Sequence, residues 1–177
     1  YLADRAVRLR YKARLGLLRA ADLVLAISEA SRRDAIELLG LDPERVHSIG
    51  GGVGPEFAGT DQPVAQLVTA LQETMPTLRE GFVLYPGGAD FRKNMPGLIR
   101  AFGLLPESLR RGHQLVIVCR LPPGTEAQLR ATAESAGVGR DELVLPGFVD
   151  DETLVSLYQA THLVVFPSLY EGFGLPI

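Results

Sequence analysis

Residues suited to binding a charged ligand gather in a loop that follows the apolar run Phe82–Tyr85. The loop holds two glycines, two adjacent cations and an asparagine, namely Gly87, Gly88, Arg92, Lys93 and Asn94. Exposed backbone amides and paired cations are groups that bind phosphate oxygens, especially where a loop enters the positively polarised start of a helix. The pattern therefore predicts a phosphate-binding loop.

Rare residue types coincide in this loop. Of the 18 basic residues only Lys12 and Lys93 are lysines, and Asn94 is the sole asparagine of the chain. This coincidence favours a specific role for the pair. The structural alternative is an exposed lysine beside an ordinary asparagine helix cap.

A second loop, from Pro167 to Pro176, combines one carboxylate with glycines ahead of a helix start that proline marks. Its candidate residues are Glu171, Gly172, Phe173 and Gly174. Backbone amides at glycines can hold an anion, and a carboxylate can accept hydrogen bonds from sugar hydroxyls. A solvated loop carboxylate is the alternative interpretation of Glu171.

Other polar residues give weaker indications. The histidines are scattered at positions 47, 113 and 162 without further ligands at metal-binding spacing, so we predict no metal site. The acidic run Asp150–Glu152 is typical of a helix start, where the helix dipole favours negative charge. Cys119 ends an apolar run and is predicted to be a small buried hydrophobe. No combination of residues forms a nucleophilic triad.

Short apolar runs alternating with helical patterns must position these loops. The predicted strands are residues 23–27, 46–49, 82–85, 115–118, 143–145 and 163–166. Helices are predicted over residues 3–19, 32–39, 62–73 and 95–104, with Ser31 capping the second and Asn94 the fourth. A fifth helix is predicted to begin with a Thr125/Gln128 capping box and to end before Gly137, and a sixth to be capped by Asp150 or Asp151. Unbroken apolar strands separated by helices predict the α/β class, a Rossmann-like doubly wound parallel sheet.

A glycine-rich stretch divides the chain. Residues 50–55 read Gly-Gly-Gly-Val-Gly-Pro, which neither a helix nor a strand interior tolerates, so we place an interdomain hinge there. The expected domains are residues 1–57 and 58–177. The chain opens inside a predicted helix and closes where another should begin, which predicts an internal fragment of a longer protein.

Composition limits the class of partner. The 18 basic and 21 acidic residues give a net charge of −3, which argues against nucleic acid as a partner. A single cysteine, with no signal-like segment, indicates a reducing cytoplasmic setting. The basic helix predicted at residues 3–19 is compatible with peripheral contact to the inner face of a membrane, although a solvated outer face is the simpler interpretation.

Four motifs together resemble a known family, the retaining GT-B glycosyltransferases of glycosyltransferase family 4. They are Ala21–Ser28, Tyr85–Asn94 with its Arg-Lys-Asn ending, Gly147–Val149, and Phe166–Pro176. The resemblance implies a carboxyl-terminal donor domain of GT-B type preceded by the end of an amino-terminal acceptor domain. It covers nearly the whole chain.

The resemblance also implies roles for individual residues. Lys93, with Arg92 beside it, would contact the diphosphate of the donor, and Val149 would lie beside the nucleobase. Glu171 would be the first glutamate of the paired-glutamate motif, near the transferred sugar, with the backbone of residues 172–174 close to sugar and phosphate. Retention in such enzymes needs no protein nucleophile, and no metal or other cofactor is expected.

The implied activity is transfer of a hexose from a GDP- or UDP-sugar to a glycan or lipid-linked acceptor in polysaccharide biosynthesis. The Arg-Lys-Asn ending is similar to that of mannosyltransferase-like members, which favours GDP-mannose as donor. The alternatives are a non-catalytic nucleotide- or phosphate-binding module of this fold and a GT-B nucleotide-sugar epimerase.

Several positions depart from the family pattern. Gly88 stands where an arginine is frequent, Gly51 and Gly54 replace the asparagine and aspartate of the hinge motif, and Cys119 replaces a common glycine. The second glutamate of the pair would lie just past Ile177. The isolated chain is therefore expected to be inactive.

Overall fold

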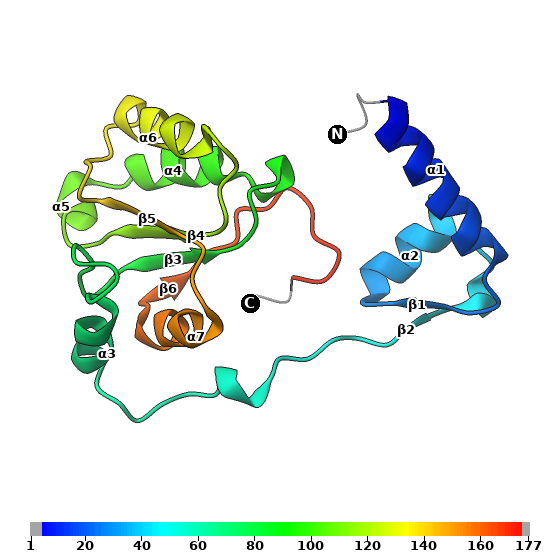
Figure 1. Cartoon of the computed structure of the whole chain (residues 1–177), viewed down its shortest axis with the longest axis horizontal. Helices are drawn as coiled ribbons and strands as arrows, with labels where there is room; N and C mark the ends of the chain where they lie inside the picture. Colours follow the sequence, from blue (N-terminus) through cyan, green and yellow to red (C-terminus); the bar gives the residue numbers. More distant parts are fainter. Residues whose placement is uncertain (1–4, 175–177) are drawn as a thin grey trace. The chain divides into compact units, whose positions relative to one another are not determined.

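The structure is a computed structural model that describes residues 5–174 (Figure 1). The chain divides into two compact units. Of the described residues, one unit contains residues 5–53 together with residues 171–174, and the other runs from Gly54 to Tyr170. Residues 49–54 form neither helix nor strand.

The described part of the smaller unit has two helices and a two-stranded parallel sheet. Its elements are α1 (Arg5–Ala20), β1 (Val24–Ala26), α2 (Glu29–Glu37), a 3-10 turn (Pro43–Arg45) and β2 (Val46–Ser48). The strands pair Val24 with Val46 and Ala26 with Ser48. Its core is small, consisting of Ala26, Leu41 and Val46 with partly buried neighbours from α2.

The larger unit is a parallel sheet covered by helices. Its strands are β3 (Val83–Pro86), β4 (Leu115–Val118), β5 (Leu143–Gly147) and β6 (Leu163–Val164). Its helices are α3 (Val64–Leu71), α4 (Met95–Gly103), α5 (Glu107–Arg110), α6 (Thr125–Ser135) and α7 (Asp151–Ala160), with 3-10 turns at Pro55–Phe57 and Phe91–Lys93. The strand order is β5-β4-β3-β6, and every pair is parallel. The predicted α/β class is confirmed.

Both faces of this sheet are buried, because successive strand residues point to opposite sides. In β4, Leu115 and Ile117 pack with α4 and α6, whereas Val116 and Val118 pack with α3 and α7. Figure 1 shows the two helix layers on either side of the strands. Such two-sided burial explains why the strands read as continuous apolar runs.

The register places the four carboxyl ends along one edge. Val83 pairs with Leu115 on one side and Leu163 on the other, and Leu115 pairs with Leu143. The loops after β3, β4, β5 and β6 therefore share this edge, where open parallel sheets bind ligands.

Three predicted helix starts were wrong in detail. Ser28, not Ser31, caps α2, and its hydroxyl accepts the Ser31 N–H at 3.0 Å. Gly124 occupies the N-cap position of α6 without a side-chain bond, so there is no Thr125 capping box. Asn94 holds the N-cap position of α4, yet its side chain makes no capping bond.

Two further differences concern element length. The strand predicted over residues 163–166 is limited to Leu163–Val164, because only these residues pair with β3. The one-turn helix α5 was not predicted, since four residues are too short for a periodic pattern. Of the two cap candidates for α7, Asp150 is the one used, accepting the Thr153 N–H at 2.8 Å.

Candidate functional site

An aspartate folds the loop that follows β3. The Asp90 carboxylate accepts the Arg92 backbone N–H at 3.0 Å and the Arg92 Nε–H at 2.8 Å, closing the turn Phe91–Lys93. The Arg92 side chain is half exposed, and the Asp90 side chain is mostly covered. Arg92 therefore presents a guanidinium already oriented by a carboxylate, next to the half-buried Lys93.

Asn94 ends this turn in a left-handed backbone conformation, with φ 53° and ψ 37°. Among the described residues it is the one non-glycine with positive φ. Its Nδ2 donates to the carbonyl of Pro167 at 3.2 Å. Asparagine tolerates this conformation better than most residues, so the rare residue type matches a specific backbone requirement.

The loops after β3 and β6 lie side by side. The Leu169 N–H donates to the Arg92 carbonyl at 2.7 Å, and Asn94 reaches Pro167 as described. Beneath them, the rings of Tyr85 and Phe166 lie 5.9 Å apart. Two segments separated by about seventy residues in the sequence therefore form one connected surface beside Arg92 and Lys93.

The two glycines of the loop after β3 are not equivalent. The Gly87 N–H donates to the Val118 carbonyl at 3.2 Å, so this amide extends the sheet. A β-carbon at Gly87 would collide with the hydroxyl of buried Tyr85, which itself donates to the Gly88 carbonyl at 3.0 Å. Gly88 is exposed, and a β-carbon there would meet no atom within 4 Å.

The loops after β4 and β5 contribute a pair that the sequence analysis missed. The guanidinium carbon of Arg120 lies 5.0 Å from the ring centroid of Phe148. Phe148 is 67% exposed, whereas Val149 packs partly buried against the core beside α7. The sequence did offer a signal for this pair, because Arg120 is the first charged residue after the β4 run and Phe148 is the aromatic residue of the Gly-Phe-Val motif.

The predicted residues of the last loop belong to the smaller unit. The carbonyl of Gly172 accepts hydrogen bonds from the hydroxyls of Ser28 and Ser31, the latter at 3.0 Å. Glu171 is half-buried and Phe173 is exposed, and Gly174 has a positive φ of 79°. Leu175, Pro176 and Ile177 lie outside the described residues. Ser31 was predicted only as a helix cap and Ser28 only as the end of an apolar run, so the contact of both hydroxyls with Gly172 was missed.

Burial and hydrogen bonding shift two pKa values near the carboxyl edge. Burial raises the pKa of the Cys119 thiol, which lies 4.0 Å from the Met95 sulfur. The neutral thiol is a poor nucleophile, in line with its predicted role as a small buried hydrophobe. Hydrogen bonds from Thr153 lower the pKa of Asp150, which keeps the α7 cap ionised.

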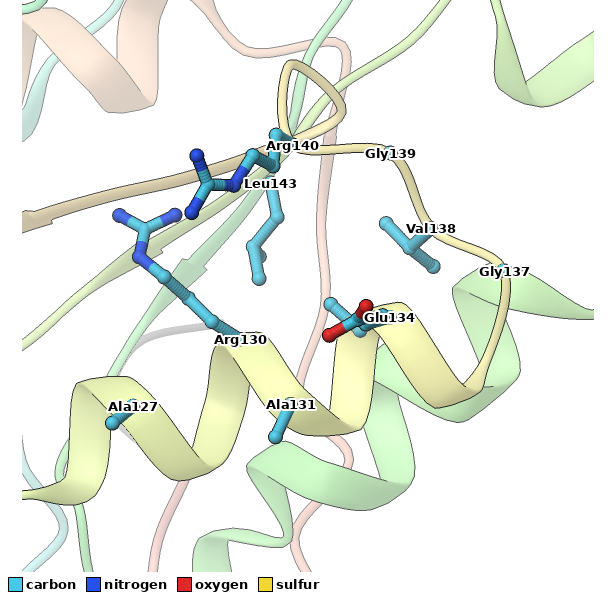
Figure 2. Close-up of a pocket in the computed structure, with 10 residues that line it drawn as sticks. Ala127, Arg130, Ala131, Glu134, Gly137, Val138, Gly139, Arg140 and Leu143 are labelled. Atoms are coloured by element: carbon cyan, nitrogen blue, oxygen red, sulfur yellow. The ribbon is translucent and has the colours of Figure 1, made fainter.

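A cavity lies away from these loops, between α6 and the chain leading into β5. Its volume is about 710 Å³, and its lining includes Arg130, Glu134, Arg140 and Leu143. Figure 2 shows the guanidinium groups of Arg130 and Arg140 extending to the same side of it. Arg130 pairs with Glu126 at 2.8 Å on the exposed surface. None of the predicted site residues lines this cavity.

Two histidines described above as scattered are neighbours in the structure. The rings of His113 and His162 lie 5.8 Å apart, at the amino ends of β4 and β6, and His113 Nδ1 lies 2.5 Å from the Gly81 carbonyl. Pairing of β3 with both strands brings them together. Among residues 5–174 no three His, Cys, Asp or Glu side chains form a group that could hold a metal ion.

Comparison with known proteins identifies the family. Residues 72–177 match the model of the glycosyl transferases group 1 family, and the chain belongs to this family. The matched segment includes the loop after β3, Arg120, Phe148 and the Glu171 segment.

Similar proteins occur among characterised sequences and solved structures. The chain is 36% identical over 176 residues to the serotype-specific mannosyltransferase WbdA of Escherichia coli, covering 99% of this chain and 21% of that protein. It aligns with WaaG, a glycosyltransferase involved in lipopolysaccharide biosynthesis, at TM-score 0.71 and 24% identity, covering 96% of this chain and 46% of WaaG. HepE of Anabaena, solved with UDP and glucose, aligns at TM-score 0.75 and 21% identity, covering 92% of this chain and 43% of HepE. These neighbours have the GT-B fold, as predicted, and the chain spans about a fifth of the WbdA length.

Proposed function

We propose that the protein containing this chain transfers a hexosyl group, specifically mannosyl, from a nucleotide-diphosphate sugar to a glycan or lipid-linked acceptor with retention of configuration. The observation that carries this proposal is the Arg92-Lys93-Asn94 turn, held at the carboxyl edge of a parallel sheet in a family of glycosyltransferases. The mannosyltransferase name of the WbdA relative supports mannose, and GDP-mannose is the proposed donor.

The chemistry proposed for this edge is electrostatic. Departure of a nucleoside diphosphate leaves negative charge on its terminal phosphate, and fixed cations lower the barrier by stabilising that charge. Lys93 and Arg92 are the proposed cations, with the exposed Gly88 segment as backbone contact. Asn94 supports them by holding the turn against the loop after β6.

Glu171 is proposed to accept hydrogen bonds from the transferred sugar, with the backbone of Gly172, Phe173 and Gly174 close to sugar and phosphate. Val149 is proposed to lie beside the base, through its backbone, because its side chain packs against the core. No metal or other cofactor is part of the proposal.

The first test is calorimetric titration of the chain with GDP, UDP and ADP. We expect saturable binding that Lys93→Ala weakens about tenfold, since an ion contact to phosphate contributes roughly 1.5 kcal/mol. Lys12→Ala is the matched control, because Lys12 is the other lysine and lies exposed on α1. Equal affinity of the Lys93 and Lys12 variants would contradict the assignment.

The second test uses the longer protein with GDP-mannose and UDP-glucose and determines the anomeric configuration of the product by NMR. Transfer of mannose with retention is expected. Binding of a nucleotide sugar that stays unchanged would instead favour the non-catalytic binding module, and an epimerised nucleotide sugar would favour the epimerase.

We also propose peripheral contact of α1 with an anionic membrane surface. Six of its sixteen residues are basic and none is acidic, no residue of α1 is buried, and Leu9 and Leu17 are 70% and 73% exposed. Basic helices with exposed apolar side chains bind anionic bilayers, as on the cytoplasmic leaflet. Among the described residues no helix is long and apolar enough to cross a membrane.

Co-sedimentation with vesicles tests this contact. Binding to vesicles containing phosphatidylserine should exceed binding to neutral vesicles and should fall in an Arg8→Ala/Lys12→Ala variant and at high salt. Equal binding of the variant and the original chain would exclude α1 as the contact.

A further inference from the structure

Arg120 and Phe148 form an outward-facing pair on neighbouring strands. β4 and β5 pair Val118 with Gly147, so Arg120 and Phe148 extend from adjacent positions at the carboxyl edge. Gly147 has a positive φ of 81°, which turns the chain so that Phe148 points outward while Val149 turns back to the core. The geometry leaves an aromatic ring, 67% exposed, with a guanidinium over it.

The guanidinium of Arg120 keeps its hydrogen-bonding capacity. Within residues 5–174 the Arg120 guanidinium contacts the Phe148 ring, at 5.0 Å from the ring centroid, and forms no ion pair with a carboxylate. A cation over an aromatic face is held by the ring quadrupole while its N–H donors still point outward. An exposed arginine is thereby oriented without being neutralised.

A flat ring beside an oriented guanidinium matches the chemistry of guanine. Aromatic rings stack on any base, whereas the arginine fork donates two parallel hydrogen bonds to two adjacent acceptors. Guanine offers such a pair at O6 and N7, adenine offers N7 beside an amino donor, and uracil has no adjacent pair of acceptors. Of these bases, guanine alone fits the fork.

The pair also lies at a suitable distance from the phosphate loop. Neighbouring strands are about 4.8 Å apart, so the loops after β3 and β5 are roughly 10 Å apart across β4. The ribose of a nucleoside diphosphate bridges such a distance between its diphosphate and its base. We propose that Arg120, held over Phe148, selects guanine in the donor by bonding its O6 and N7 while Phe148 stacks on a base. This inference rests on the proposed nucleotide-sugar site.

Titration of the chain with GDP, UDP and 7-deaza-GDP, which lacks the N7 acceptor, tests the proposal. The original chain should bind GDP more tightly than the other two. Arg120→Ala should weaken GDP binding roughly 5- to 140-fold, the range of a bidentate arginine contact, and should abolish the preference for GDP over 7-deaza-GDP. Arg120→Lys keeps the charge without the fork and should lose the same preference.

Two further variants separate the roles. Phe148→Ala should weaken GDP and UDP similarly, because stacking tolerates every base. Arg100→Ala, at an exposed arginine on α4, is the matched control and should change neither affinity. Circular dichroism checks that each variant is folded.

The outcomes distinguish this inference from the proposed function. Equal loss of GDP and UDP affinity in Arg120→Ala would assign Arg120 to the phosphates and overturn base selection, while leaving the Lys93 site in place. Tighter binding of UDP than GDP by the original chain would overturn it as well. No saturable binding of any nucleotide, either by this chain or by the longer protein, would refute the proposed function and this inference together.

Discussion

Replacing Asn94 by alanine should lower the unfolding free energy of the larger unit by about 2 kcal/mol. Two effects add. The left-handed backbone at φ 53° costs a residue with an ordinary β-carbon roughly 1–2 kcal/mol. Loss of the Nδ2 bond to the Pro167 carbonyl costs about 0.5–1.5 kcal/mol more.

Glycine at the same position separates these effects. Asn94→Gly loses the same hydrogen bond but adopts positive φ without strain, so it should be more stable than Asn94→Ala by about 1 kcal/mol. At most other positions alanine stabilises relative to glycine, so the order itself reports the backbone conformation. Urea unfolding followed by circular dichroism measures the difference, since the chain has no tryptophan for fluorescence.

Gly97 supplies an internal check. A β-carbon at Gly97 would collide with the Asn94 side chain, so Gly97→Ala should destabilise the original protein. In the Asn94→Gly variant this collision cannot occur, so Gly97→Ala should raise the unfolding free energy by up to about 1 kcal/mol, because alanine favours a helix more than glycine does. Asn94→Ala as stable as Asn94→Gly, or the same Gly97→Ala effect in both backgrounds, would refute the reasoning.

Three further predictions concern other positions. Gly88→Arg should leave stability within about 0.5 kcal/mol of the original, because its β-carbon meets open space, and should tighten GDP binding in calorimetry; weaker binding would separate Gly88 from the phosphate site. Glu142→Ala should lower the unfolding free energy measured in urea by about 3 kcal/mol or more, because it removes the carboxylate that pairs with Arg110 at 3.0 Å and leaves a largely buried guanidinium bonded, within residues 5–174, only to the Gly103 carbonyl. A loss below about 1 kcal/mol would contradict that burial. Hydrogen bonds from Thr153 lower the pKa of Asp150, so its carboxylate stabilises the fold above the unfolded-state pKa of about 3.9, and this stabilisation is lost as pH falls through the folded-state pKa. The difference in unfolding free energy between the original protein and Asp150→Asn should therefore be constant near neutral pH and shrink in acid. A constant difference down to pH ~2 would contradict this.

Local pattern was sufficient to locate the strands of the larger unit. The four apolar runs predicted its strands, and β4 has the predicted bounds, 115–118, because a strand buried on both faces must be apolar at every position. Asp150 was predicted as one of two candidate caps, since capping involves residues only three positions apart. The parallel direction of the strands then follows from the helices that connect them.

Local pattern failed to predict how two helix starts are formed. Ser28 and Ser31 are both suitable cap residues, and Ser28 is the one that caps α2. Asn94 looked like an ordinary cap, but its left-handed backbone and its bond to Pro167 follow from how two loops pack.

The sequence by itself determined the class of fold, the family and the loops that carry cations, glycines and a carboxylate, because hydrophobic periodicity and residue chemistry are properties of short segments. Tertiary structure alone decided which distant residues meet. It brought Arg120 over Phe148, His113 beside His162, and Gly172 to Ser28 across 144 positions of sequence. Such contacts depend on strand order and register, which arise only when separate segments bury their apolar faces together.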